Sequence, residues 1–264
     1  MIKKILLFVT LFVWATTSIA QSDVSQPDLA REKRMAAEVE DAVLDGDVVY
    51  LNDGNHQFMA IDTEPEGDTK GAVIILHGRG FHPDWEDTVF PLRTQLPQKG
   101  WRTLSLQMPV LEKSAKYYDY VPIFSYAHPR IEAGINYLKE QGIDNIVLLA
   151  HSCGAHMAMD WVRSQQGNVG NKIKAYIGVG MGATDYKQKM KQPFPLAELD
   201  IPVLDIYGEK EYPAVIRMAP ERLAMLKKAG NPKSKQVVIP GANHYFTNKG
   251  EPLVKAVSEW LDHL

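Results

Sequence analysis

A serine between small residues is the most informative feature of the chain. The sequence AHSCG occupies residues 150–154 and directly follows an apolar run at 146–149. A strand that ends in small-x-Ser-x-small and then turns into a helix needs those small residues, because bulky side chains there would strike neighbouring elements. The unpaired N–H groups that begin such a helix favour developing negative charge. The pattern therefore predicts that Ser152 is a nucleophile.

A serine hydroxyl is a weak nucleophile and needs a base. His244 ends the sequence PGANH, in a loop just beyond a predicted strand at 237–239. Such a loop can carry an imidazole over the carboxyl edge of a sheet toward Ser152. An ordinary surface histidine is the alternative interpretation, but the serine motif favours His244 as the general base.

The acid that orients the base has three candidates. The predicted strand at 202–207 runs into the sequence GEKE at 208–211. Glu211 lies three residues past the glycine, in a loop at the carboxyl edge of the sheet, and ranks first. Asp205 lies inside the strand, where it points into a core face or toward a helix, and ranks second. Glu209 is closer to the strand end and solvated beside Lys210, so it ranks third.

The oxyanion of an acyl-transfer reaction needs N–H donors. A predicted buried strand at 74–76 runs into the sequence HGRG at 77–80, whose glycines let the backbone direct N–H groups into a cavity. We expect the backbone N–H groups of Arg79 and Cys153 to form the oxyanion hole. The Arg79 side chain either lies outward in solvent, which we favour, or faces an anionic group of the substrate.

The remaining histidines and the single cysteine show no further chemistry. His77 with His82, and His151 with His156, lack metal-binding spacing, so no metal site is expected. We interpret Cys153 as an oxyanion-hole residue rather than a reactive thiol. Neither a phosphate loop nor a dinucleotide fingerprint occurs, so no cofactor is expected.

The first 20 residues have the pattern of a signal peptide. Lys3 and Lys4 precede an apolar run at 5–15, and Ser18-Ile19-Ala20 has the small-x-small form of a cleavage site. The run is shorter than the roughly 20 apolar residues of a membrane anchor. We predict cleavage after Ala20, no membrane span thereafter, and a periplasmic or secreted protein.

The charge of the chain limits its partners. Removal of the first 20 residues lowers Lys+Arg from 29 to 27 against 32 acidic residues, which changes the net charge from −3 to −5. This balance gives no electrostatic argument for nucleic acid or anionic lipid as a partner. A small-molecule acyl substrate is the expected partner, and no protein partner is indicated. One cysteine forms no intrachain disulfide, so a core must stabilise the protein.

Strand and helix patterns alternate along most of the chain and predict an α/β fold, with a mostly parallel, doubly wound sheet flanked by helices. Residues 21–45 are predicted to form an N-terminal tail and a charged helix capped by Asp28, and residues 46–264 the main domain. A helix is expected at 220–228. The short connection at 182–201 leaves no room for a large lid. The aromatic-rich stretch at 110–129 either lines a pocket or packs as a surface loop.

The four motifs HGRG, AHSCG, GEKE and GANH, in this order, resemble the α/β-hydrolase superfamily over residues 71–264. The resemblance implies that Ser152 is the nucleophile, His244 the base and Glu211 the acid. It also implies that Arg79 and Cys153 are the oxyanion donors. Ala150 replaces the usual first glycine of the serine motif, and glutamate stands where aspartate is commoner. Residues 100–109 resemble an uncharacterised, exported bacterial branch of that superfamily, and this resemblance brings no substrate with it.

Two functions follow as hypotheses. The first is a serine hydrolase of the esterase type that cleaves an acyl ester through an acyl-enzyme, and the same residues leave peptidase and thioesterase activity open. The second is a catalytically inactive hydrolase fold that serves as a binding module of the cell envelope. An assembled serine, histidine and carboxylate would count against the second hypothesis, and a dispersed set would support it.

Overall fold

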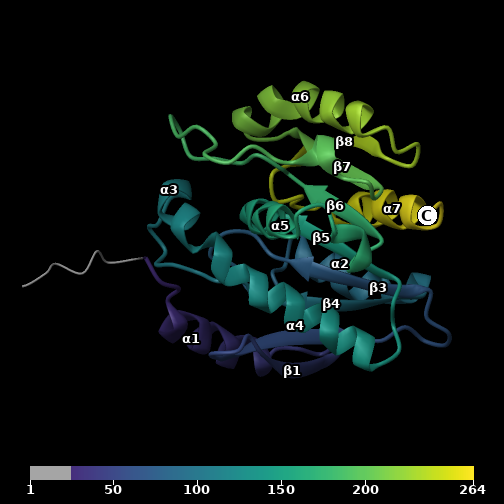
Figure 1. Cartoon of the computed structure of the whole chain (residues 1–264). Helices are drawn as coiled ribbons and strands as arrows, with labels where there is room; N and C mark the ends of the chain where they lie inside the picture. Colours follow the sequence, from purple (N-terminus) through teal and green to yellow (C-terminus); the bar gives the residue numbers. More distant parts are fainter. Residues whose placement is uncertain (1–24) are drawn as a thin grey trace, which may run out of the picture.

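A sheet of eight strands forms the centre of the computed structural model, which describes residues 25–264 (Figure 1). The expected signal peptide and its cleavage site lie outside the described residues. In chain order the strands are β1 (Asp47–Asn52), β2 (Gln57–Thr63), β3 (Gly71–Leu76), β4 (Trp101–Leu106), β5 (Ile146–His151), β6 (Ala175–Val179), β7 (Val203–Lys210) and β8 (Lys235–Asn243). Their order in the sheet is β1-β2-β4-β3-β5-β6-β7-β8. β1 and β2 pair antiparallel, and the pairs from β4 to β8 are parallel.

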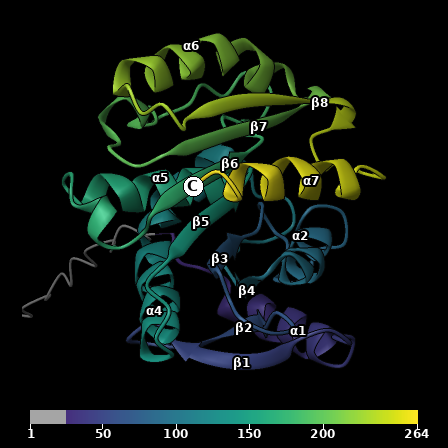
Figure 2. The same cartoon turned by 90° about the vertical axis from the view of Figure 1, so that its right-hand side faces the viewer.

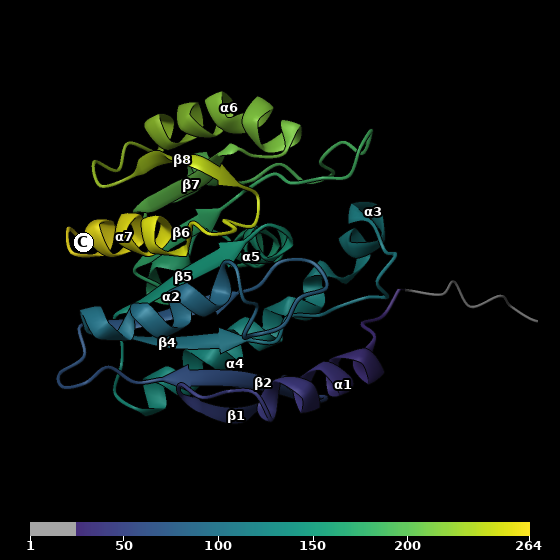
Figure 3. The same ribbon diagram turned by 180° about the vertical axis from the view of Figure 1, so that it is seen from behind.

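Helices cover both faces of this sheet (Figure 2). The α-helices are α1 (Leu29–Glu40), α2 (Val89–Gln95), α3 (Tyr117–Tyr120), α4 (Ala127–Glu140), α5 (Cys153–Ser164), α6 (Pro213–Ala229) and α7 (Gly250–Leu261). Short 3-10 helices are η1 (Pro97–Lys99), η2 (Val121–Tyr126), η3 (Val169–Asn171) and η4 (Leu196–Glu198). α4 and α5 lie on one face, and α1, α2 and α7 on the other, which Figure 3 shows from behind. The doubly wound fold predicted from the sequence is confirmed.

The two faces have separate cores, which the alternation of side chains along β3 explains. Ile74 and Leu76 pack in the core beneath α4 and α5, and Val73 and Ile75 pack in the core beneath α2 and α7. Because successive side chains of a strand point to opposite faces, a strand covered on both sides must be apolar at every position. Every residue of β3 is buried.

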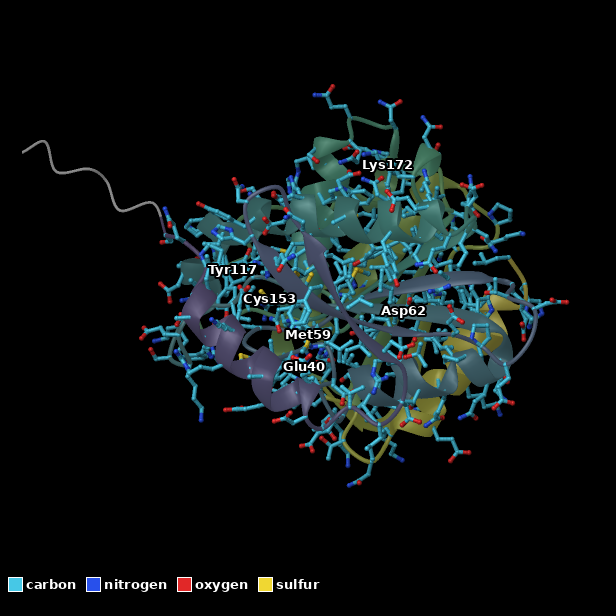
Figure 4. The ribbon with its side chains drawn as sticks, turned by 90° about the horizontal axis from the view of Figure 1, so that it is seen from below. Glu40, Met59, Asp62, Tyr117, Cys153 and Lys172 are labelled. Atoms are coloured by element: carbon cyan, nitrogen blue, oxygen red, sulfur yellow. The ribbon has the colours of Figure 1, made fainter. Side chains whose placement is uncertain are left out.

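Helix α1 is fixed on the sheet. Asp28 caps it by accepting a 2.9 Å hydrogen bond from the Arg31 N–H. Glu32 is buried and pairs with Arg130 of α4 at 2.9 Å. The apolar side of the helix packs on Met59 and Ile61 of β2. Figure 4 views the molecule from this side, where Met59 and Glu40 are labelled; both line a cavity of about 520 Å³.

Two connecting segments can be compared with the expectations from the sequence. The aromatic stretch at 110–129 contains α3 and η2, and its side chains Tyr117, Tyr120 and Phe124 pack into the core, whereas Tyr118 and Tyr126 are exposed. The segment between β6 and β7 contains only η4 as regular structure, and no large lid is present in this described segment.

Helix α6 begins earlier than predicted. It starts at Pro213, which occupies the first helical position that suits proline, whereas the expected start at Pro220 lies inside the helix. Pro220 has no N–H for the carbonyl of Ile216, four residues before it. The prediction that helix 220–228 starts at the proline was therefore wrong by seven residues.

Candidate active site

Ser152 lies on a strained turn between β5 and α5. Its φ is 55° and its ψ is −117°, a conformation that a non-glycine residue adopts only where its surroundings impose it. The Ser152 N–H donates a 2.9 Å hydrogen bond to the carbonyl of Val179 on β6. A Cβ on Gly154 would lie 2.6 Å from the carbonyl oxygen of His77. A glycine two residues after the serine is therefore required, because α5 begins against the end of β3.

The structure brings together the three residues expected to act in catalysis. His244 Nε2 lies 2.8 Å from Ser152 Oγ, and His244 Nδ1 contacts Glu211 Oε1. The same carboxylate oxygen accepts a 2.8 Å hydrogen bond from the Tyr212 N–H. Because a carboxylate only accepts, Nδ1 carries the proton, and Nε2 is left to accept from the serine hydroxyl. All three side chains belong to buried residues.

Two glycines allow this assembly. A Cβ on Gly208 would lie 2.3 Å from the carbonyl oxygen of Ala242, so a side chain there would push β7 away from β8. This close approach places Glu211 beside His244. Gly180, with a φ of 61°, passes behind the pair; a Cβ there would lie 3.0 Å from His244 Cε1 and 3.2 Å from Glu211 Oε2.

The two expected oxyanion donors lie just after two adjacent strands. Arg79 follows β3, Cys153 begins α5, and β3 pairs directly with β5. Within residues 25–264, neither backbone N–H donates to another protein group. Cys153 is also in the first turn of α5, where N–H groups have no partner in the helix. Both N–H groups are thus available to an oxyanion.

The Arg79 side chain forms an ion pair, which differs from both of its expected roles. It makes two hydrogen bonds to Asp185, one of them 3.2 Å from Nη2 to Oδ1. Asp185 also accepts a 2.7 Å bond from the Tyr117 N–H. Burial opposes ionisation of Asp185, but these hydrogen bonds and the arginine charge lower its pKa. The side chain thus connects the oxyanion loop to α3 and to the β6–β7 connection.

The other two acid candidates are engaged elsewhere. Asp205 is fully buried and accepts from Arg222 Nε at 2.8 Å and from Gln236 at 2.7 Å; burial raises its pKa. It faces α6, as its position inside the strand predicted. Glu209 is exposed and accepts a 2.8 Å bond from the Gly241 N–H. Of the three carboxylates, Glu211 is the one in contact with His244.

Two residues that sequence reasoning missed support His244. His151 Nε2 lies 2.9 Å from the carbonyl oxygen of His244, and burial lowers the pKa of His151 to about 3. The ring of Tyr212 stacks on the imidazole of His244, with the centroids 4.3 Å apart. Each directly neighbours a recognised residue, His151 before Ser152 and Tyr212 after Glu211, but no motif assigns a role to either.

Two other features, a metal centre and a membrane-spanning helix, are absent from residues 25–264. Across residues 25–264, no group of three or more His, Cys, Asp and Glu side chains is arranged to hold a metal ion. No helix within the same residues has the length and apolar character needed to cross a membrane.

The protein has the α/β-hydrolase fold, which solved structures of serine hydrolases share. Est1E from Butyrivibrio proteoclasticus is 17% identical, with a TM-score of 0.61, over 82% of this chain and 98% of its own. Dienelactone hydrolase from Anabaena variabilis is 20% identical, with a TM-score of 0.61, over 82% of this chain and 96% of its own. XC6422 from Xanthomonas campestris is described as an α/β serine hydrolase without a lid. It is 15% identical, with a TM-score of 0.60, over 84% of this chain and 95% of its own.

The chain belongs to the family described as "Protein of unknown function (DUF3530)", whose pattern matches residues 10–122 and 124–263. No curated protein matches the sequence.

Proposed function

We propose that the protein is an exported serine hydrolase that cleaves an acyl ester through an acyl-enzyme. The observation that carries the proposal is the 2.8 Å separation of His244 Nε2 and Ser152 Oγ, with Glu211 in contact with the opposite nitrogen. A nucleophile within reach of a base that a third group orients is the arrangement that covalent acyl transfer requires. The same assembly counts against an inactive binding module.

The first half-reaction forms the acyl-enzyme. Ser152 Oγ attacks the carbonyl carbon of the ester while His244 Nε2 takes the hydroxyl proton. The oxyanion accepts hydrogen bonds from the backbone N–H groups of Arg79 and Cys153. The tetrahedral intermediate then breaks its bond to the alcohol oxygen, and His244 returns the proton to that oxygen as the alcohol leaves. Glu211 holds the imidazole in the required tautomer and stabilises its cation.

The second half-reaction uses water. Water enters where the alcohol left, gives a proton to His244 Nε2, and its oxygen bonds to the acyl carbon. The intermediate breaks the bond between Ser152 Oγ and the acyl carbon, and His244 returns the proton to Oγ. The products are a carboxylic acid and the free serine. Two structural neighbours, dienelactone hydrolase from Anabaena variabilis and monoglyceride lipase from Saccharomyces cerevisiae, are named for a lactone and an ester, which supports an ester over other acyl compounds.

Fluorophosphonate labelling tests this proposal. The purified protein should form a bond from Ser152 Oγ to phosphorus with loss of fluoride, identified by mass spectrometry of the peptide. Ser152→Ala should show no labelling, and Ser164→Ala, which changes a serine at the far end of α5, should label as the wild type does. Absence of labelling in a folded wild-type protein would overturn the proposal.

Export rests on the sequence of residues 1–20 and has its own test. When the full chain is produced in a Gram-negative host, the protein should be recovered from the periplasm or the medium with Gln21 as its first residue. Intact-mass measurement distinguishes this product from one that retains Met1. Retention of Met1 in a cytoplasmic product would contradict export without affecting the proposed chemistry.

A further inference from the structure

Four aromatic rings form a continuous surface beside the general base. We define the aromatic platform as Phe81, Trp85, Tyr212 and Tyr245. Phe81 and Trp85 stack with centroids 3.7 Å apart and planes at 6°. Phe81 meets Tyr245 edge-on at 5.8 Å, and Tyr245 meets Tyr212 at 6.2 Å. The two edge-on separations are typical of favourable aromatic pairs, and the Phe81–Trp85 stack is closer than these.

The platform connects the two loops that carry the chemistry. A Cβ on Gly78, the residue before Arg79, would lie 3.1 Å from Phe81 Cδ2, so the Phe81 ring packs on the oxyanion loop. At the other end, the His244 ring lies 4.3 Å from the Tyr212 centroid and 5.2 Å from that of Tyr245. The four rings therefore reach from the oxyanion loop to the general base.

The rings are accessible, and the two tyrosine hydroxyls of the platform are satisfied. Tyr212 is 39% exposed, and the other three residues are half-buried. The hydroxyls of Tyr212 and Tyr245 hydrogen-bond to each other at 2.7 Å. Trp85 Nε1 is buried without a hydrogen-bond partner among residues 25–264, so the accessible surface of the platform consists of the rings and the two paired hydroxyls. A ligand that rests on this surface is favoured by being apolar and flat.

The reaction determines which part of the substrate lies there. His244 must return its proton to the departing alcohol oxygen, so that oxygen lies within hydrogen-bonding reach of Nε2. The oxyanion is held by the backbone N–H groups of Arg79 and Cys153 and not by His244. The carbon attached to the departing oxygen therefore begins next to the rings that flank His244. The geometry points to the aromatic platform as the subsite for the leaving group, and to esters of flat, aromatic alcohols as the substrate class; this inference rests on the proposed function.

The test compares two acetate esters whose alcohols have the same number of carbon atoms, benzyl acetate with a flat ring and cyclohexylmethyl acetate with a puckered one. Both give the same acetyl-enzyme, so a difference between them arises in acylation and is measured by kcat/KM. We expect the wild type to favour benzyl acetate by about threefold to tenfold, the range that aromatic pairing supplies. Hydrolysis of the acetyl-enzyme should have one rate constant for both esters, since the alcohol has already left.

A variant identifies the ring responsible. Phe81→Leu keeps apolar volume but removes the ring, and should abolish most of the preference for benzyl acetate. Phe90→Leu is the matched control, because Phe90 is an exposed phenylalanine of α2 outside the platform; it should keep the preference. The wild-type comparison alone decides the matter if Phe81→Leu does not fold.

The outcomes separate this inference from the proposed function. Labelling of Ser152 with equal kcat/KM for the two esters would overturn the leaving-group subsite and leave the serine hydrolase intact. A preference that survives in Phe81→Leu and disappears in Phe90→Leu would also overturn it. If the folded wild type neither labels nor hydrolyses an ester, the proposed function fails and the subsite falls with it.

Discussion

The carbonyl oxygen of His244 lies 2.9 Å from Nε2 of His151, the residue directly before Ser152. His151 is fully buried, and burial lowers its pKa to about 3, so the ring is neutral near pH 7. A carbonyl only accepts, so the proton of the neutral ring lies on Nε2. His151 thus connects the backbone of the base to the turn of the nucleophile.

His151→Leu should therefore slow labelling of Ser152 by up to about a hundredfold, because small displacements of reacting groups are costly. It should also lower the free energy of unfolding by about 1–3 kcal/mol, since the buried carbonyl loses its donor. His151→Gln supplies an N–H at a similar position and should restore most of the labelling rate. A Gln variant as slow as the Leu variant, with both folded, would show that the hydrogen bond does not position His244.

The acids can be distinguished by exchanging each carboxylate for its amide. Glu211→Gln removes the charge that orients and stabilises the His244 imidazole, and should lower kcat by about 10²–10⁴ with little loss of stability. Asp205→Asn should instead leave Arg222 buried without a counter-charge and cost about 3–5 kcal/mol of unfolding free energy. Ester kinetics and urea unfolding of the two variants measure both effects. The reverse assignment, with kcat lost only in the Asp205 variant, would contradict the role of Glu211.

Local patterns in the sequence were enough to predict the fold and the candidate catalytic residues. The small residues around Ser152 and the apolar strand before it follow from the tight turn itself, and Gly154 shows that clash directly. His244 and Glu211 could be placed because loops after parallel strands gather at one edge of a sheet. Asp205 could be ranked lower from its position inside a strand.

The contacts that join distant segments could not be predicted. Asp185 lies 106 residues from Arg79, in a connection without a periodic pattern, so nothing near either residue indicates their ion pair. The pairing of His151 with His244 depends on which way two loops turn after β5 and β8. The prediction of where α6 starts was wrong for a local reason. Two prolines seven residues apart each suit a first helical position, and only packing decides between them.

Helix α1 precedes residues 71–264, the region that resembles the α/β hydrolases, yet it should contribute to the stability of this protein. Glu32 is buried, accepts a 3.1 Å bond from the Val110 N–H, and pairs with the buried Arg130. Glu32→Gln should lower the free energy of unfolding by up to about 3 kcal/mol, since Arg130 loses one counter-charge and keeps Asp53. Glu38→Gln changes an exposed residue of the same helix and should remain within about 0.5 kcal/mol of the wild type. Equal urea midpoints for the two variants would show that α1 is dispensable to the core.

Three buried histidines should make the folded protein sensitive to acid. Burial lowers the pKa of His77 and His151 to about 3 and of His156 to about 4, from a model-peptide value of 6.5. Between the folded-state pKa values and 6.5, the unfolded chain binds protons that the folded chain does not. The free energy of unfolding therefore falls as the pH falls from 6.5 toward 4. Each histidine contributes a slope of up to about 1.4 kcal/mol per pH unit.

His156 offers the cleanest measurement of this slope, because it contacts the carbonyl of Ala183 at 3.0 Å and not the candidate catalytic residues. His156→Gln keeps a donor for that carbonyl and removes the titration. Urea unfolding from pH 7.5 to 4.5 should show that the variant loses about 1.4 kcal/mol less per pH unit than the wild type below pH 5.5. His263→Gln, an exposed histidine after α7, should follow the wild-type curve. Parallel curves for the wild type and His156→Gln would mean that His156 is protonated in the folded state, and that burial does not hold it neutral.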